Sequence, residues 1–276
     1  MFCIKLDLIC EQIKWRKMKL NLKTLIVSVS MAAVLTAAQS CSDNDNKDYY
    51  YYYPNAIVTV KPVEGGDPSF YMQLDDSTTL VAENILKPPF GNKEVRALAS
   101  IEETGAAAEG GYDKVVHVYA IDSILTKNTV PYTDKHTVDS LYGYDPVEMI
   151  GDWMTVVEDG YITLRVRVVT GDYSTVHRLT LLTGVNPEDP YEVEFRHKIE
   201  GSSNQVYGPQ PMLGDALVAF RLDSLPDTRG ETVKLTLRWR AFDGAEHTAT
   251  FDYCTRASSP SKMKIESGAS FLTNIE

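Results

Sequence analysis

Cysteine is scarce in this sequence, and the few cysteines present are widely spaced. The 276 residues contain four, Cys3, Cys10, Cys41 and Cys254, with no C-x-x-C pair. Small disulfide scaffolds need more cysteines, and structural zinc sites need closely spaced ligand pairs. The cysteines therefore exclude a disulfide framework and give no support for a zinc site.

Recognisable catalytic motifs are also missing. The sequence has no G-x-S-x-G elbow, P-loop or dinucleotide-binding glycine pattern. The adjacent carboxylates Asp75–Asp76 and Glu102–Glu103 point to opposite faces of a strand, so neither is a natural acid–base couple, and both pairs are read as turn and solvated charge. No histidine has metal-site spacing, although His177 and His197 both flank "NPEDP" and their pairing in space stays open. We therefore expect no catalytic residue, no metal and no cofactor, and a protein that is not an enzyme.

Positive charge is short in most of the chain. The formal net charge is −11, yet the first 41 residues are basic, with six Lys or Arg against two Asp or Glu. Without that segment, 21 basic and 36 acidic residues leave a net charge of −15. Such a body repels phosphate backbones and anionic membrane faces, which excludes nucleic acid as an expected partner.

One apolar run stands near the N-terminus, from Thr24 to Ala37, after Lys19 and Lys23. It is shorter than the roughly 20 residues of a membrane-spanning helix, but it fits a secretory signal core. A buried core helix is the less favoured alternative, because the run ends in small and then polar residues. We predict a signal peptide over residues 1–40. Its natural start is either Met18 or, with an unusually long basic region, Met1.

The end of this signal, "TAAQSC", resembles a bacterial lipoprotein signal. The resemblance implies a lipid-modified Cys41 carrying acyl chains such as palmitate, and hence stable anchoring. The alternative is ordinary cleavage near Ala38, with Cys41 unmodified. Residues 41–55 then form a solvated tether, and their "SDNDNKD" resembles a surface-export signal. These features predict an outer-membrane lipoprotein of a Gram-negative cell envelope, with surface exposure left open.

Five tyrosines, Tyr49–Tyr53, follow the acidic tether. Two readings stay open for them. They either extend as a strand that docks on the next domain, or form an amphipathic belt near lipid headgroups, where tyrosine is common.

Residues 56–130 alternate with period two between Gly- and Pro-rich breaks, which predicts a small OB-like β-barrel. Val58 and Val60 share one side of "IVTVKPV", and Phe70 and Met72 share one side of "FYMQLDD". By the same parity, Tyr71 and Tyr119 lie on the face away from the core. They are therefore a candidate ligand face.

Residues 131–146 show no sustained pattern and are predicted to be a linker, with one short helical turn. Residues 147–276 alternate again and predict a β-sandwich. In "YITLRVRVVT", Ile162 and Leu164 point to the core, whereas Thr163 and Arg165 point to solvent. The fold class is therefore all-β, a small OB-like barrel followed by a β-sandwich after a lipoprotein signal peptide.

Several phrases resemble the NigD-like lipoprotein family, including "NAIVTVKP", "HRLTLLTGVNPEDPYEVEFRH" and "ALVAFRLDSLPDTRGETVKLTLRWRAFDG". The resemblance covers nearly all of the chain after the signal. It implies an OB-type domain, a C-terminal β-sandwich domain and a lipoprotein start. An immunity role, proposed for the founding member from a bacteriocin operon, also follows from it.

These observations predict a lipid-anchored envelope protein that binds a bacteriocin or another envelope component, without enzymatic activity. The alternative is a glycan- or peptide-binding accessory lipoprotein at the cell surface that uses Tyr71 and Tyr119. The membrane, reached through Cys41, is the remaining expected partner.

Overall fold

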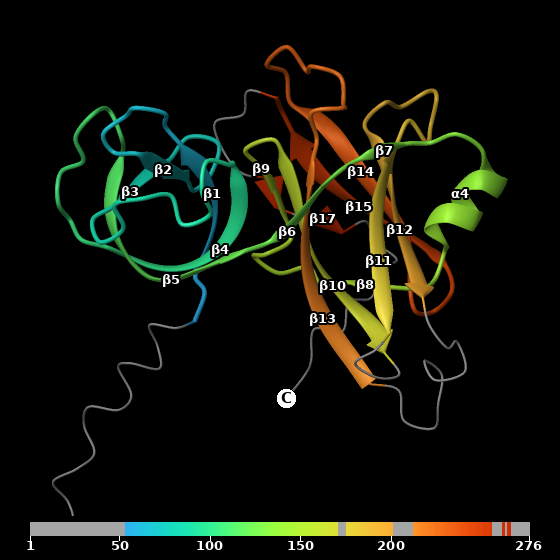
Figure 1. Ribbon diagram of the computed structural model, residues 1–276. Coiled ribbons are helices and arrows are strands. Elements are labelled where there is room, and N and C mark those ends of the chain that lie inside the picture. The colour runs from blue at the N-terminus through green and yellow to red at the C-terminus, as the bar shows by residue number, and fades with distance from the viewer. Residues whose placement is uncertain (1–52, 171–174, 201–211, 256–260, 263, 266–276) are drawn as a thin grey trace, which may run out of the picture. The chain divides into compact units, whose positions relative to one another are not determined.

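The computed structural model describes residues 53–170, 175–200 and 212–255, together with the strand residues 261–262 and 264–265. The predicted signal peptide, Cys41 and Tyr49–Tyr52 lie outside these residues. Strands dominate the fold, with one short helix among the described elements, so the all-β prediction is confirmed (Figure 1). In the part of the chain that is described, no helix has the length and apolar character needed to cross a membrane.

Five strands close into a barrel in the order β1-β2-β3-β5-β4, with β1 and β4 completing the ring. The hairpin β2–β3 is antiparallel and β3–β5 is parallel. Val58, Val60, Phe70 and Met72 are buried in the barrel core, as their parity predicts. The strands are β1 (Ala56–Pro62), β2 (Phe70–Gln73), β3 (Thr79–Ala82), β4 (Val95–Glu103) and β5 (Lys114–Ser123).

Two sheets pack face to face to form the sandwich. The first runs β16-β9-β10-β13-β6, with β8 also paired to β10, and the second runs β17-β15-β14-β12-β11-β7. The first sheet contains β6 (Leu125–Asn128), β8 (Glu148–Met149), β9 (Val156–Glu158), β10 (Tyr161–Thr170), β13 (Met212–Arg221) and β16 (Ser261–Lys262). The second contains β7 (Val130–Pro131), β11 (Val176–Thr183), β12 (Glu192–Glu200), β14 (Val233–Arg240), β15 (Glu246–Tyr253) and β17 (Lys264–Ile265).

The sandwich core is built from the inward positions of both sheets. Ile162 and Leu164 lie in it as expected, with Phe195 set edge-on against Phe220 and Trp239 fully buried. Burial of one such large apolar side chain contributes about 1.5–3 kcal/mol. The alternation of "YITLRVRVVT" and "VKLTLRWR" is therefore what holds the two sheets together.

The boundary between the two domains differs from the predicted one at residue 130. The barrel strands end at Ser123, and β6 already pairs with β13 of the sandwich. β7 pairs with β11, and the predicted linker contains the helix α4 (Lys135–Tyr142). β6 and β7 are too short to show alternation of their own. Pairing with neighbouring strands holds them in place.

α4 covers part of the second sheet's outer face and is held by its two ends. The side chain of Asp134 caps its N-terminus by accepting from the Thr137 N–H at 3.0 Å. Gly143 ends it at φ 66 and ψ −174, a backbone conformation that is essentially reserved for glycine. Val138, on the inner side of the helix, is fully buried.

The barrel and the sandwich share an apolar contact. It consists of buried side chains from the outer face of the barrel and from β9, β10 and β13, namely Ile57, Ile124, Val156, Tyr161 and Ala219. Ile57 alternates with Val58 and Val60 along β1, so it lies on the side of the strand away from the barrel core. The sandwich, rather than water, covers that side.

A buried ion pair crosses the same contact. Arg96 of β4 is fully buried and pairs with Glu158 of β9, which is itself 7 % exposed. The Arg96 guanidinium also donates to the hydroxyls of Thr59 at 3.0 Å and Thr163 at 3.3 Å. The prediction that Thr163 points to solvent is therefore wrong, because the barrel covers this end of β10.

Carboxylates surround the ion pair. The Asp159 N–H donates to Asp76 Oδ1 at 2.5 Å, and Lys61 Nζ donates to Asp159 Oδ1 at 2.7 Å. Burial, with the nearby Asp159 charge, raises the pKa of Asp76 to about 6. Burial also raises the pKa of Glu158 to about 7, although Arg96 acts in the opposite direction. The reading of Asp75–Asp76 as turn and solvated charge holds for Asp75, whose carboxylate accepts from the Ser77 and Thr78 N–H groups. It is wrong for Asp76.

Candidate binding surface

The outer face of β2, β3 and β5 carries a row of half-buried aromatic and apolar side chains. Alternation places them outward, because Phe70, Met72, Leu80 and Val116 fill the barrel interior. Val81 pairs with Val115 across β3 and β5, so these two side chains lie on one outer row. We call the following set the barrel strip: Tyr71, Val81, Tyr112, Val115, His117 and Tyr119.

A tyrosine pair forms one end of the barrel strip. The rings of Tyr71 and Tyr112 lie 5.4 Å apart between centroids, tilted by 39°. The turn that carries Tyr112 is fixed to β3, because the Thr79 N–H and hydroxyl donate to Asp113 Oδ2 at 2.8 and 2.7 Å. These hydrogen bonds lower the pKa of Asp113 below its usual range. The two rings are therefore held in place before any ligand arrives.

A histidine and a tyrosine form the other end. The rings of His117 and Tyr119 lie 4.8 Å apart between centroids. His117 Nδ1 lies 2.9 Å from Glu83 Oε1, and the Tyr119 hydroxyl donates to Glu102 Oε2 at 2.5 Å. About two fifths of the His117 and Glu83 side chains stay accessible, at 38 % and 44 %. A partner can therefore reach both the rings and the carboxylates.

The composition of the barrel strip limits what it can bind. Ring faces and valine side chains offer apolar contact area, while the hydroxyl, imidazole and carboxylate groups offer hydrogen bonds. The carboxylates of Glu83 and Glu102 disfavour an anionic ligand. The surface suits a neutral or basic polypeptide, or the apolar face of a sugar ring.

Tyr71 and Tyr119 both lie on this surface, but the fold does not bring them together. Each is at one end of the barrel strip, with a separate ring partner. Those ring partners, Tyr112 and His117, were not predicted from the sequence. His117 shares the parity of Tyr119 in "KVVHVYA" and could have been found, whereas Tyr112 sits in a glycine-rich turn where parity gives no direction.

His177 and His197, left open above, meet in the sandwich. His197 Nδ1 lies 3.1 Å from the Pro146 carbonyl, which can only accept, so this nitrogen carries the proton. His197 Nε2 then accepts from His177 Nδ1 at 2.9 Å. Burial lowers the pKa of both imidazoles. This chain of neutral rings joins β11, β12 and the segment after α4, and it is structural.

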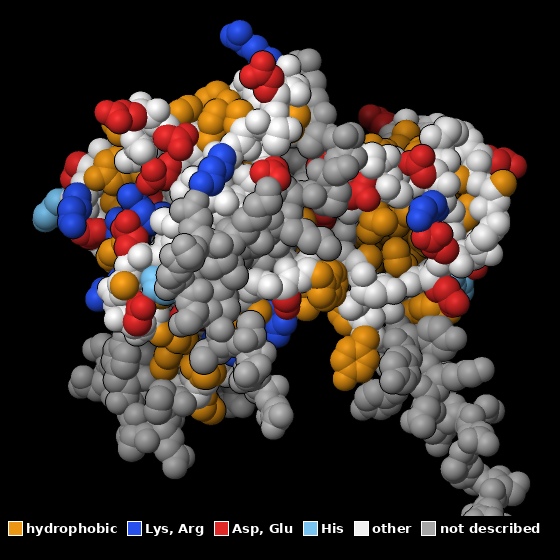
Figure 2. Space-filling model, turned by 180° about the vertical axis from the view of Figure 1, so that it is seen from behind, with side chains coloured by type: hydrophobic (Ala, Val, Ile, Leu, Met, Phe, Trp, Pro, Cys, Tyr) orange, Lys and Arg blue, Asp and Glu red, His pale blue; other side chains and the backbone are white. Residues whose placement is uncertain are grey.

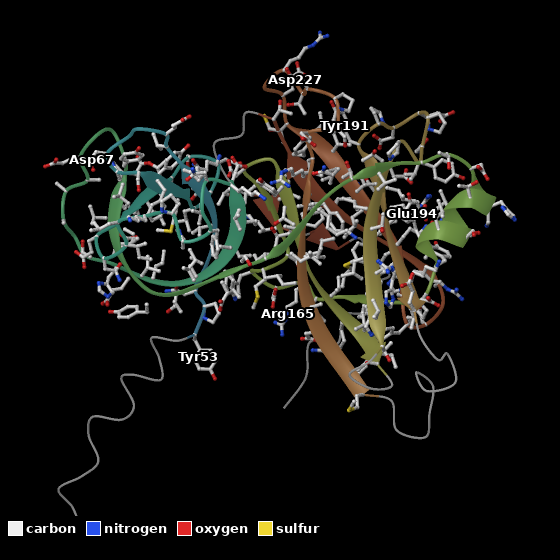
Figure 3. The ribbon with its side chains drawn as sticks, in the orientation of Figure 1. Tyr53, Asp67, Arg165, Tyr191, Glu194 and Asp227 are labelled. Carbon is white, nitrogen blue, oxygen red and sulfur yellow. The ribbon has the colours of Figure 1, made fainter. Side chains whose placement is uncertain are left out.

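A group of charged side chains lies on the outer face of the second sheet near α4, where Figure 3 labels Glu194. Glu194 pairs with Arg196 and, at 2.5 Å, with Arg238. The Arg196 guanidinium lies over the Tyr144 ring, 4.1 Å from its centroid, and its Nη1 donates to Asp139 of α4 at 2.8 Å. Glu194 and Arg196 are nearly buried, and these contacts hold the helix against the sheet, so we read the group as structural.

Metal ligands do not gather within the described residues, where no group of three or more His, Cys, Asp or Glu is arranged to hold an ion. Cys254 is half-buried, with its sulfur 3.7 Å from the Thr228 hydroxyl.

Both halves of the chain match known domain families. Residues 57–124 match the NigD-like N-terminal OB domain, and residues 128–253 match the NigD-like C-terminal beta sandwich domain. No curated protein matches the chain.

Three solved structures are similar along most of their length. A protein from Parabacteroides distasonis whose name relates it to a toxin is 30 % identical, with 72 % of this chain and 92 % of that one covered and a TM-score of 0.55. A protein of unknown function from Bacteroides vulgatus is 19 % identical, covers 72 % and 89 %, and has a TM-score of 0.57. A NigD-like immunity protein from Bacteroides caccae is 18 % identical, covers 74 % and 99 %, and has a TM-score of 0.50.

The two structures that are 19 % and 18 % identical show a common fold with this chain. The two matched domains occur here in sequence order and account for most of the residues after the predicted signal. The chain belongs to the NigD-like family.

Proposed function

We propose that this chain is a lipid-anchored binding protein of the cell envelope, without enzymatic activity, and that its partner is a protein. The anchor is Cys41, in an outer-membrane lipoprotein of a Gram-negative bacterium. Two relatives come from Bacteroides and one from Parabacteroides, which is consistent with that location. One acyl chain binds a bilayer weakly, but the several chains of a lipoprotein anchor would hold the protein there.

The barrel strip is the observation that carries the binding function. Its tyrosines are half-buried and each contacts a neighbouring ring, and the Tyr119 hydroxyl also donates to the Glu102 carboxylate. Tyrosines of this kind often dominate binding energy at protein interfaces, because a rigid ring buries a large area at little cost in entropy. The buried pair of Arg96 and Glu158 joins the barrel to the sandwich, so both can contribute to one contact surface.

A bacteriocin is the protein partner that the names of two relatives support most directly. The relative from Bacteroides caccae is named an immunity protein, and the relative from Parabacteroides distasonis has a name that relates it to a toxin. An anchored immunity protein would capture the toxin at the envelope. The acidic body would speed its encounter with a basic toxin.

The test uses the chain with Cys41→Ala, which removes the lipid, against bacteriocins from strains related to the host. Loss of a central tyrosine contact costs about 2 kcal/mol or more, so Tyr71→Ala and Tyr112→Ala should each weaken binding roughly 30-fold or more. Tyr142→Ala, in α4 of the sandwich half, is the matched control and should bind as the parent does. If no bacteriocin binds, and deletion of the gene leaves bacteriocin sensitivity unchanged, the immunity function is wrong.

A glycan- or peptide-binding accessory function is the second candidate, because the barrel strip also suits the apolar face of a sugar ring. A glycan array separates the two. Binding that Tyr71→Ala abolishes would favour the glycan function, and an array without binding would count against it.

A further inference from the structure

Exposed apolar side chains collect at one end of the sandwich. Eight large apolar residues are exposed in the described part of the chain, and three of them, Val176, Met212 and Leu213, stand at the first residues of β11 and β13. We propose that this end, together with Tyr53 beside the barrel, rests on the surface of a lipid bilayer. The proposal depends on the lipid anchor of the proposed function and adds which side of the protein faces the membrane.

Strand pairing places the three residues at one end of the sandwich. Met212 and Leu213 pair with Thr170 and Val169, at the opposite end of the β10–β13 ladder from Tyr161, which contacts the barrel. Val176 begins β11, and only five residues stand between it and the end of β10, so β11 starts from the same end. Leu213 is 60 % exposed, the largest exposed fraction of the three.

Tyr53 marks where the chain leaves the barrel toward Cys41. It is 68 % exposed. In Figure 3 it is labelled on the lower side, and the ends of β10 and β13 also point to the lower side in Figure 1. Figure 2 shows hydrophobic side chains protruding along this lower side beneath both domains. The first described residue of the chain, Tyr53, and the exposed apolar side chains are therefore on one side of the described part of the protein.

The length of the chain between Cys41 and Tyr53 allows this contact. Eleven residues separate them, so even a fully extended tether keeps Tyr53 within roughly 40 Å of the anchored cysteine. A tether of this length makes the second contact intramolecular, so a weak apolar surface is enough to orient the protein. Tyrosine is favoured at the headgroup level of a bilayer.

The opposite side has a different character. Figure 3 labels Asp67 and Asp227 there, and both are exposed. The exposed Leu86 lies near Asp67, because its carbonyl accepts from the Ser69 hydroxyl at 2.8 Å. A single exposed leucine is ordinary for a protein surface. The end that faces the membrane also carries charge, because Arg178 pairs there with Glu200 at 2.6 Å. The contact therefore combines apolar burial with a neutralised ion pair at a zwitterionic surface.

The experiment measures the distance of single labels from the lipid. The lipidated full chain, with Cys254→Ser, carries a fluorophore at Leu213→Cys or, as the matched control, at Leu86→Cys. It is reconstituted into vesicles of phosphatidylcholine and phosphatidylethanolamine that contain a headgroup nitroxide quencher. We expect at least twofold stronger quenching at residue 213 than at residue 86, and we expect Met212→Asp to reduce it.

The outcomes separate the two proposals. If the chain does not float with the vesicles, or floats equally with Cys41→Ala, the lipid anchor is wrong and the proposal falls with it. If it floats only with Cys41 intact but the two labels are quenched equally, the anchor stands and the orientation is wrong. Stronger quenching at residue 86 would likewise overturn the orientation.

Discussion

Replacement of the buried pair of Arg96 and Glu158 should uncouple the barrel from the sandwich. Arg96 is fully buried and spans the two domains, with bonds to Thr59 on one side and to Thr163 on the other. Removal of one partner leaves the other charge buried and unpaired, which costs about 3–5 kcal/mol. That is a large share of the roughly 5–15 kcal/mol by which domains are stable.

The double variant should recover much of this loss. Arg96→Met and Glu158→Leu together leave no charge behind, and apolar replacements of a buried pair are often nearly neutral. We therefore expect the two single changes to be non-additive by about 2–3 kcal/mol or more, with the double variant close to the parent. Work at pH 8 keeps Glu158, with a pKa of about 7, ionised.

The assay is urea unfolding, followed with two probes. Trp239 is buried in the sandwich core, and the barrel segment from residue 56 to 123 contains no tryptophan, so fluorescence reports the sandwich. Circular dichroism reports both domains. The parent should give coincident transitions, and each single variant should give separate ones. Single changes that add within about 0.5 kcal/mol would show that the pair does not couple the domains.

Three further changes test other parts of the structure. Asp76→Asn should raise the free energy of unfolding above that of the parent, and this gain should be about 1.5 kcal/mol larger at pH 7 than at pH 4 after allowance for solvent screening. The pKa of Asp76 is raised to about 6, so the stability of the parent falls as pH rises from about 4 to about 6; unchanged pH dependence in denaturant midpoints would contradict this. Gly143→Ala should cost about 2 kcal/mol or more in thermal unfolding, because the added Cβ would lie 2.8 Å from Lys198 Cβ; equal loss in Gly160→Ala, where nothing lies within 4 Å, would show that backbone strain alone acts. Trp239→Ala should cost about 3–5 kcal/mol in the sandwich transition, and a smaller loss would mean that the core collapses around the missing ring.

Period-two patterns were sufficient to assign the strands of the two cores. Val58, Val60, Ile162 and Leu164 all lie where their parity placed them. Parity names the two faces of a strand, but it does not say what covers the outer one. Thr163 was assigned to solvent for that reason, although the barrel buries it.

Very short strands and contacts between residues far apart in the chain could not be predicted from the sequence. β6 and β7 are four and two residues long, and pairing with β13 and β11 holds them, so no internal pattern could reveal them. The candidate binding surface was half predicted. Tyr71 and Tyr119 followed from alternation, whereas Tyr112 reaches the surface from a turn whose path depends on tertiary contacts.

Photo-crosslinking in intact cells can show whether the barrel strip binds a partner. A photo-reactive residue at Val81 sits within the barrel strip, and one at Glu188, in an exposed turn of the sandwich, is the control. We expect one discrete crosslinked species at residue 81 that is absent at residue 188 and is lost with Tyr71→Ala. The same crosslinks from both positions, or none from residue 81 in bacteriocin-exposed and glycan-fed cells alike, would contradict it.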